Sequence, residues 1–236
     1  MFSFTNQDVL VVGGSSGIGL ATAKAFAAAG ARVTIASRSA DRLDAALEEI
    51  GHGAKAEVLD TGDATAVETF LSKHTWNHVV VSAAKTPTGP VRKLSLEDAH
   101  TAMDSKFWGA YRVARSAKIV DGGSLTLVSG FLAVRPSATS VLQGAINAAL
   151  ESLVRGMALE FSPVRVNAVS PGMIRTPLWN GMEAEKREAL FASVAEKLPA
   201  RRAGEAEDIA NAILYAAATP FTTGSTITVD GGGSIA

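Results

Sequence analysis

The sequence has no cysteine, which excludes disulfide bonds and thiolate catalysis. It has only two tyrosines, Tyr111 and Tyr215, so few phenolic groups could act as acids. An excess of one charge is also missing: the net charge of −1 gives no electrostatic reason to expect a nucleic-acid or membrane partner. The longest uncharged run, 209–229, contains Pro220 and Gly224. It therefore predicts a helix, a turn and a strand rather than a membrane span.

Targeting and metal-binding signals are missing as well. The opening residues MFSFTNQDVL have no basic segment before an apolar run, so no secretory signal is predicted and we expect a cytoplasmic protein. The histidines have no metal-ligand spacing and fall where loops, strand starts or helix starts are expected: His52, His74, His78 and His100. We therefore expect no metal site. The 236 residues, 47% of them hydrophobic, are typical of one globular domain.

Short β-branched runs alternate with longer helical patterns along the whole chain. Strands are expected near residues 8, 31, 54, 76, 123, 164 and 225, and helices over 18–29, 39–50, 63–73, 96–117, 139–160 and 205–218. This alternation predicts an α/β fold, a single doubly wound Rossmann-type domain over 1–236 with a seven-stranded parallel sheet. The one long excursion, 173–199, is predicted to be a flap over a substrate site.

A glycine-rich loop follows the first expected strand and opens the first helix. The run VVGGSSGIG places Gly13, Gly14, Gly17 and Gly19 where the backbone must approach a ligand closely. Amides at the start of the helix could then hold a pyrophosphate. The alternative is a tight strand-to-helix turn with no ligand, but the flanking strand and helix favour nucleotide binding.

The end of the second expected strand indicates which dinucleotide binds. An acid there would accept hydrogen bonds from a ribose 2′-hydroxyl, but the sequence has Ser37 and Arg38. A hydroxyl and a guanidinium suit a 2′-phosphate, which favours NADP(H) over NAD(H). The alternative is that Arg38 is only a surface charge.

Together these motifs resemble the short-chain dehydrogenase/reductase family over nearly the whole chain. The matching segments are the loop from Gly13 to Gly19, Leu59–Asp60, VRVNAVSPGMIRTPL, LPARRAGEAEDIA and VDGGG. The resemblance implies a nicotinamide cofactor, a small-molecule substrate and a homo-oligomer, dimer or tetramer, built on segments 96–117 and 139–160. The cofactor-binding residues it implies, together with those proposed above, are Gly13, Ser15, Ser16, Gly17, Ile18, Gly19, Ser37, Arg38, Asp60, Ala83, Asn147, Pro171, Gly172, Ile174 and Thr176.

The sequence departs from the family at its four catalytic places. Counting from neighbouring motifs, Gln143 stands at the tyrosine place, Asn147 at the lysine place, Gly130 at the serine place and Lys106 at the asparagine place. No other register restores the pair: the residues four positions after the two tyrosines are Arg115 and Thr219.

Four residues are candidates for the altered chemistry: Lys106, Ser129, Gln143 and Asn147. The two amides can bind a ligand but cannot exchange a proton near neutral pH. Lys106 could donate a proton if a partly dry cleft lowers its pKa. The alternative is that it reaches solvent or pairs with Asp104. Ser129 is expected to face away from the site unless its strand has already ended.

Other side chains also carry expectations. Arg135 could hold an anionic substrate, or it is a surface arginine. Trp108 and Tyr111 are expected in the core or an interface. The apolar residues of the flap could cover a substrate or merely pack the flap down; they are Leu178, Trp179, Met182 and Phe191.

Three functions remain open. The first is an NADP-dependent oxidoreductase with an atypical active site, whose substrate needs little acid catalysis or whose acid is Lys106. The second is a non-catalytic NADP(H)-binding sensor or inactive subunit. The third is a lyase or isomerase in a former dehydrogenase pocket, which the retained cofactor motifs disfavour.

Overall fold

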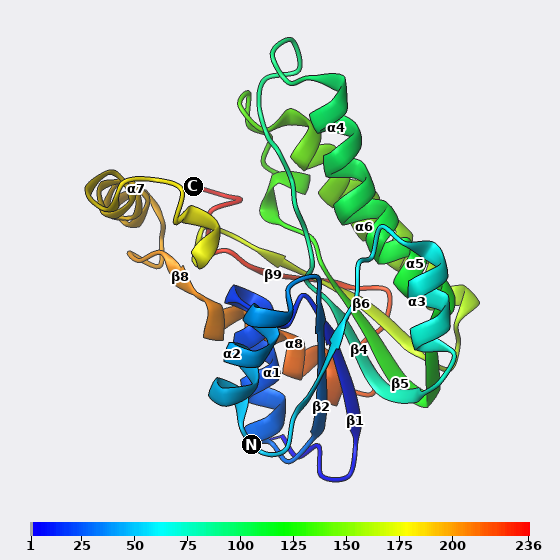
Figure 1. Ribbon diagram of the computed structural model, residues 1–236. Helices are drawn as coiled ribbons and strands as arrows, with labels where there is room; N and C mark the ends of the chain where they lie inside the picture. Colours follow the sequence, from blue (N-terminus) through cyan, green and yellow to red (C-terminus); the bar gives the residue numbers. More distant parts are fainter. Residues whose placement is uncertain (1) are drawn as a thin grey trace.

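A single twisted sheet organises the computed structural model, which describes residues 2–236 (Figure 1). Its seven strands run in the order β3-β2-β1-β4-β5-β6-β9, and every neighbouring pair is parallel. Their bounds are β1 Asp8–Val12, β2 Arg32–Ser37, β3 Lys55–Val58, β4 Thr75–Val81, β5 Lys118–Val128, β6 Arg165–Pro171 and β9 Thr226–Val229. The predicted α/β fold with a seven-stranded parallel sheet is confirmed.

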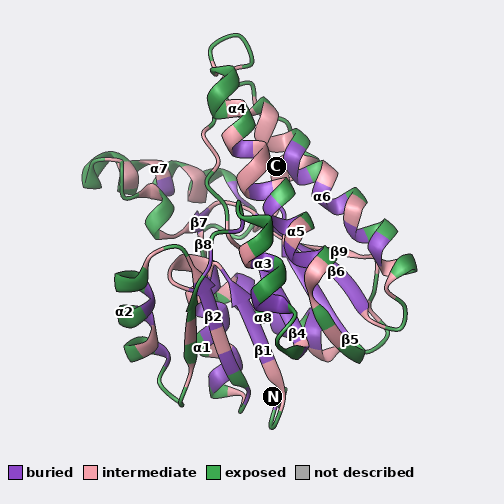
Figure 2. Cartoon of the chain, turned by 45° about the vertical axis from the view of Figure 1, so that its right-hand side comes forward, coloured by how far each residue is buried: buried purple, intermediate pink, exposed green. Residues whose placement is uncertain are grey.

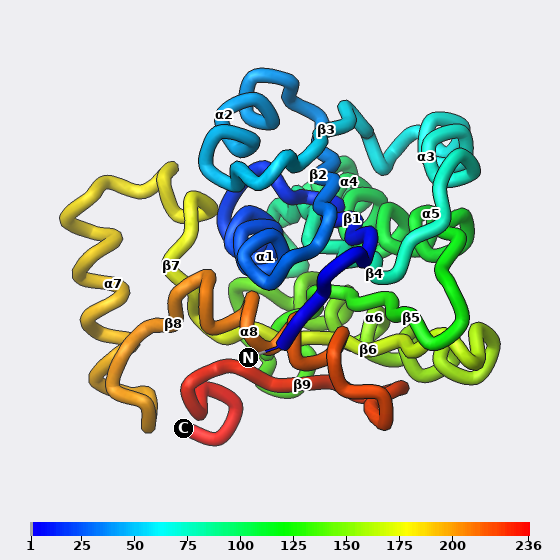
Figure 3. Tube along the Cα trace, turned by 90° about the horizontal axis from the view of Figure 1, so that it is seen from below, coloured from blue at the N-terminus to red at the C-terminus, as the bar shows by residue number. Residues whose placement is uncertain are grey.

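Helices cover both faces of this sheet. One face packs α1 (Gly17–Ala28), α2 (Ala40–Ile50) and α8 (Ala206–Ala218), and the other packs α3 (Ala64–Leu71), α4 (Leu96–Met103), α5 (Gly109–Ser116) and α6 (Val141–Glu160). Figure 3 shows the molecule of Figure 1 from below, with α1 and α8 on the opposite side of the strands from α5 and α6. Two helical layers are needed because the β-branched strands are apolar on both faces, and each face of the sheet must be shielded from water.

The core is accordingly split into two apolar clusters. On one face Leu10, Leu125 and Ile146 are fully buried, and on the other Phe26, Ile35 and Ile209 are fully buried. Figure 2 shows this burial along the strands, with exposed residues on the outward sides of the helices. The strands therefore sit rigidly between two packed layers, and their carboxyl ends provide a fixed edge for a site.

The expected helix over 96–117 is not uniform. Between α4 and α5 the chain forms one π-helical segment, Asp104–Trp108, which carries Lys106 inward and Trp108 outward. Apolar spacing cannot distinguish this widened turn from a continuous α-helix, because Ala102, Lys106 and Ala110 remain four residues apart and are all buried.

The excursion between β6 and α8 leaves the main layers. It holds β7 (Ile174–Arg175), a 3₁₀ turn η3 (Pro177–Trp179), α7 (Ala184–Lys197) and β8 (Gly204–Glu205), with β7 and β8 paired in a small sheet of their own. In Figure 1 α7 stands away from the central sheet. Within residues 2–236, no helix is long and apolar enough to cross a membrane.

Candidate active site

The site is placed by the topology of the sheet. The order of the strands reverses between β1 and β4, and the loops that leave their carboxyl ends diverge to opposite faces. Such a switch point opens a crevice at this edge of a doubly wound sheet. The glycine loop after β1 and the residues after β2, β4, β5 and β6 all meet at this edge.

The β1–α1 loop packs directly against the residues that follow β4. Gly13 has a φ of +88°, and a Cβ at this position would come within 2.5 Å of the Ala83 backbone nitrogen. A side chain is therefore excluded on two grounds, backbone conformation and space. Ser16, the N-cap of α1, makes no side-chain capping hydrogen bond, so its hydroxyl does not satisfy the first amides of the helix. Ser15, Gly17, Ile18 and Gly19 complete the loop and the first turn of α1.

The end of β2 offers a hydroxyl and a cation. The Ser37 hydroxyl oxygen is buried and has no hydrogen-bond partner among the described residues. Arg38 is exposed and makes no ion pair within residues 2–236. After β3, a carboxylate oxygen of Asp60 accepts a hydrogen bond of 2.9 Å from the Gly62 amide. A hydroxyl, a guanidinium and a carboxylate at this edge are groups that fit the adenosine end of a dinucleotide.

The segment after β6 closes the other side of the glycine loop. Thr176 lies beside Gly17, where an added Cβ would be 3.4 Å from the threonine Cβ. Pro171 and Ile174 are buried, and Gly172 leaves no room for a side chain because a Cβ would lie 2.6 Å from the Cα of Asp230. Residues predicted from the family pattern to border one cofactor are thus held at one edge by two loops.

A buried ammonium lies where β5 ends against α6. Lys106 is 8% exposed, and its Nζ donates to the Ser129 carbonyl oxygen at 2.8 Å and to the Asn147 Oδ1 at 2.7 Å. Neither alternative from the sequence holds: the ammonium does not reach solvent, and Asp104 pairs instead with Arg112 at 2.6 Å. An ammonium carries three N–H donors, so these two acceptors leave one unused.

The surroundings of Lys106 set its electrostatics. Burial lowers the pKa of its ammonium from 10.5 to about 8, while the charge of Glu151 acts in the opposite direction. Glu151 is itself 9% exposed, and its Oε1 accepts a hydrogen bond of 2.8 Å from the Ser129 hydroxyl. Ser129 therefore links the carboxylate and the ammonium, through its side chain and its backbone carbonyl respectively.

The Ser129 hydroxyl is turned to Glu151, and its single hydrogen is shared with the Val169 carbonyl oxygen at the longer distance of 3.4 Å. Through its side chain it thus supports the cluster, and no hydrogen bond joins it to Gln143 within residues 2–236. The next residue, Gly130, faces Asn147 directly, with an added Cβ 2.7 Å from Nδ2.

Gln143 lies one helical turn before Asn147 on α6, as its spacing predicts. Its Oε1 is buried and has no hydrogen-bond partner among the described residues. A buried acceptor without a donor is costly, so a donor brought here by a ligand would relieve it if the Gln143 side chain turns to meet it.

Known proteins resemble this chain over nearly its whole length. A family profile described as Enoyl-(Acyl carrier protein) reductase matches residues 12–234. A short-chain dehydrogenase/reductase of Acremonium sp is 30% identical, over 97% of this chain and 95% of that protein. The chain belongs to the short-chain dehydrogenase/reductase family. A galactitol 2-dehydrogenase (L-tagatose-forming) of Cereibacter sphaeroides is 34% identical, over 98% of this chain and 96% of that protein.

Two solved structures bear on the site of this family member. A small-chain dehydrogenase in complex with NADPH is 35% identical, with a TM-score of 0.84 over 98% of this chain and 100% of that one. An apo short-chain oxidoreductase of Pseudomonas aeruginosa PAO1, described as containing an atypical catalytic center, is 30% identical with a TM-score of 0.89 over 98% of both chains.

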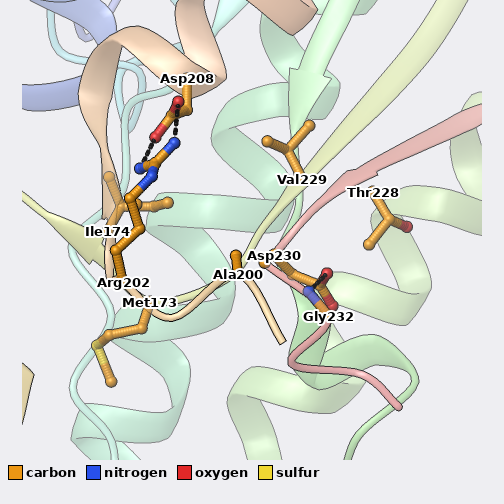
Figure 4. A pocket seen from close by; sticks show the side chains of 11 residues that line it. Met173, Ile174, Ala200, Arg202, Asp208, Thr228, Val229, Asp230 and Gly232 are labelled. Atoms are coloured by element: carbon orange, nitrogen blue, oxygen red, sulfur yellow. Dashed lines mark hydrogen bonds and ion pairs between the residues drawn. The ribbon is translucent and has the colours of Figure 1, made fainter. Parts of the chain in front are cut away.

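A separate cavity of about 360 Å³ opens beside the excursion (Figure 4). Its walls include Met173 and Ile174, the Arg202–Asp208 ion pair and the turn at Asp230. None of its lining residues belongs to the Lys106 cluster. The Arg202–Asp208 pair anchors the start of α8 and forms one wall of the cavity, so packing of the fold accounts for it.

The apolar residues of the excursion divide into two groups. Phe191 is 2% exposed; it lies 6.2 Å from Trp179, ring centroid to centroid, and under the Arg175 guanidinium at 4.3 Å. Leu178 is 77% exposed and, with Trp179 and Met182, lines a shallow apolar hollow. Packing therefore accounts for Phe191, and Leu178 stays free to contact a ligand.

The structure bears on three further expectations. Trp108 and Tyr111 are 45% and 40% exposed, which excludes the core of this chain and leaves the interface alternative. Arg135 donates to the Gly233 carbonyl oxygen at 2.9 Å, which ties its loop to the C-terminal turn. His78 lies within β4 and is buried, so it is neither a loop residue nor at the start of a strand. Within residues 2–236, no group of histidine and acidic side chains could hold a metal ion.

Glu151 is the residue that the sequence reasoning missed. It lies four residues after Asn147 on a predicted helix, so a signal was present: Gln143, Asn147 and Glu151 share one face. A charged residue following two polar ones on an otherwise apolar stripe marks a buried polar network.

Proposed function

We propose that the chain is an NADP(H)-dependent oxidoreductase with an atypical active site, in which Lys106 supplies the proton that a tyrosine supplies elsewhere in the family. The observation that supports this most is the Lys106 ammonium, buried at the carboxyl edge with one donor unused. A pKa of about 8 keeps it largely protonated at neutral pH yet able to give up a proton.

The bound cofactor would supply a hydride at the crevice. The glycine loop would hold its pyrophosphate, while Ser37 and Arg38 would receive the 2′-phosphate. Asp60 and Ala83 would border the adenosine, and Pro171, Gly172, Ile174 and Thr176 would border the nicotinamide end. The buried Ser37 hydroxyl without a partner supports this assignment, and so does the absence of an acid at the end of β2.

The protein groups around the substrate have distinct roles. Asn147 would present its Nδ2 to a ribose hydroxyl or to the substrate, since its Oδ1 is engaged by Lys106. Gln143 would orient the substrate through its free Oε1. The Ser129 carbonyl would hold the ammonium, and Glu151 would in turn hold the Ser129 hydroxyl. The excursion 173–199 would act as the substrate flap, with Leu178 as its exposed apolar contact.

A homo-oligomer is proposed on the outer face of the π-helical segment Asp104–Trp108, α5 and α6. Trp108 and Tyr111 form an edge-to-face pair on this side, with ring centroids 5.6 Å apart. Val141 and Leu159 add exposed apolar surface on α6. Exposed aromatic pairs of this kind are typical of interfaces. Sedimentation as a monomer at micromolar concentration would contradict this assembly.

The alternative function is a non-catalytic NADP(H)-binding sensor. It is favoured by one observation: both acceptors of the Lys106 ammonium are protein groups, as expected if the lysine only completes the packing.

The experiment that separates the two is an NADPH titration followed by turnover assays on ketones, cyclic imines and enones. The oxidoreductase is expected to oxidise NADPH with at least one class, and its rate should fall as pH rises through about 8, because the acid is then deprotonated. NADPH binding without turnover on any class would favour the sensor. No binding would contradict both.

A further inference from the structure

The three unusual residues at the end of β5 and on its neighbouring helices touch one another. Lys106 comes from the π-helical segment, Asn147 from α6 and Gly130 from the loop after β5. The Lys106 Nζ lies 2.7 Å from the Asn147 Oδ1, and the Asn147 Nδ2 fills the space next to Gly130. Their positions are therefore mutually dependent.

Gly130 determines which way the Asn147 amide can turn. A Cβ on residue 130 would lie 2.7 Å from Nδ2 of Asn147, closer than real Cβ contacts allow, and 3.3 Å from its Cγ, which is a tight contact. The amide would have to rotate or withdraw, and its Oδ1 would then leave the ammonium. The absence of a side chain at Gly130 is thus required for the hydrogen bond between Asn147 and Lys106.

Asn147 in turn fixes the ammonium. Lys106 has a long, flexible side chain, and only two acceptors within residues 2–236 hold its charged end: the Ser129 carbonyl and the Asn147 amide. The other charged groups nearby do not hold it directly. Glu151 on α6 bonds to Ser129, and Asp104 on the same segment bonds to Arg112.

We propose that Gly130, Asn147 and Lys106 form one interlocked unit, in which Asn147 is a positioning residue that holds the Lys106 ammonium in the site and Gly130 provides the space for it. Restoring the family's residues one at a time would conflict with this unit. Asn147→Lys would place a second ammonium against Lys106, and Gly130→Ser would push a hydroxymethyl group into the Asn147 amide. The departures are therefore a coordinated rebuilding of the site and not independent losses.

The inference rests on the proposed function only for its catalytic consequence, so its test is made without turnover. Isotope-labelled lysine in the intact protein gives the pKa of Lys106 by NMR titration, with Lys106→Arg identifying the signal. Asn147→Leu removes the acceptor and leaves little room for water, so the pKa of Lys106 should fall by about one unit or more. Asn147→Asp adds a facing negative charge, so the pKa should rise by about one unit or more.

The distinguishing variant is Gly130→Ala, which leaves every polar group in place. It should lower the pKa of Lys106 in the same direction as Asn147→Leu, because it displaces the amide. Gly156→Ala on α6 is the matched control, since a Cβ there meets nothing within 4 Å and should leave the pKa unchanged. Circular dichroism and thermal melting check that each variant folds.

A Lys106 pKa that does not respond to Gly130→Ala while it responds to Asn147→Leu would overturn the interlock. If Gly130→Ala does not fold, the two Asn147 variants decide: opposite shifts support the positioning role, and no shift from either overturns it. An enzymatically silent protein with the expected shifts would contradict the proposed function and leave the interlocked unit standing.

Discussion

Two buried polar clusters lie along strand β5, toward opposite ends of the sheet. Near the amino end, Ser124 on β5 contacts His78 on β4. At the carboxyl end, Ser129 contacts Glu151 and Lys106. In both clusters burial lowers the pKa of a basic side chain, to about 4 for His78 and to about 8 for Lys106.

The clusters differ in whether they keep hydrogen-bond donors and acceptors without partners. The His78 ring has both nitrogens engaged, Nδ1 with the Ser124 hydroxyl at 2.8 Å and Nε2 with the Gln7 Oε1 at 2.7 Å. Phe4 and Phe26 enclose the ring. The Lys106 cluster keeps a spare ammonium donor, and the Oε1 of Gln143, one helical turn before Asn147, has no partner within residues 2–236. A lowered pKa alone therefore does not identify a site; unused donors and acceptors at the carboxyl edge do.

The sharpest test of this difference replaces Lys106 with methionine. Loss of the proposed general acid should reduce kcat/KM by about 10²- to 10⁴-fold. The free energy of unfolding should also fall, because the Ser129 and Asn147 acceptors lose their donor and the buried Glu151 loses its nearby positive charge. NADPH oxidation and urea unfolding measure the two effects. Lys24→Met, on the exposed side of α1, is the control and should change neither. Full activity in Lys106→Met would remove the distinction between the clusters.

The amino-end cluster should respond to acid through stability alone. The pKa of His78 is 6.5 in the unfolded chain and about 4 when folded, so the unfolded state takes up the proton first. The stability from this group is present above pH 6.5 and is lost as pH falls toward 4, by about 3 kcal/mol.

Urea unfolding between pH 7 and pH 4 measures this loss. His78→Gln should flatten that part of the profile, whereas His100→Gln on α4 should leave it unchanged. An unchanged slope in His78→Gln would show that His78 does not carry the acid sensitivity.

A smaller effect is expected at the far end of the cofactor crevice. Arg38→Ala should weaken NADPH binding by about 10- to 100-fold, the value of one charged hydrogen-bonding partner, and leave NADH binding nearly unchanged. Fluorescence titration of both cofactors measures this. Arg42→Ala, exposed one turn into α2, is the matched control. Equal losses for the two cofactors would mean that Arg38 does not read the 2′-phosphate.

Much of the fold could be predicted because the strands are β-branched runs between helical patterns. All seven strands of the main sheet were expected, although β5 begins at Lys118, before the glycines Gly122 and Gly123 that disguise it. The π-helical segment could not be predicted, since its buried residues keep an ordinary helical spacing.

The site was less predictable than the fold. The sequence located Lys106, Gln143 and Asn147 by motif counting, but it could not say where a long flexible side chain ends. The position of the Lys106 ammonium depends on Asn147, and the Asn147 amide has room only because residue 130 is a glycine. The sequence does not show that these two residues are in contact. Glu151 was overlooked because its meaning comes from a contact with Ser129, which lies 22 residues away.

The π-helical segment has a consequence for how the inside and outside of the molecule communicate. Within five residues it turns Lys106 to the interior and Trp108 to the surface. Whatever covers Trp108 in an assembly is thus separated from the ammonium by the width of one helix, about 10 Å. A neighbouring subunit that contacts Trp108 would press on the same backbone turn that positions Lys106. No loop lies between the two residues, so a shift of this turn at the interface would also move the ammonium.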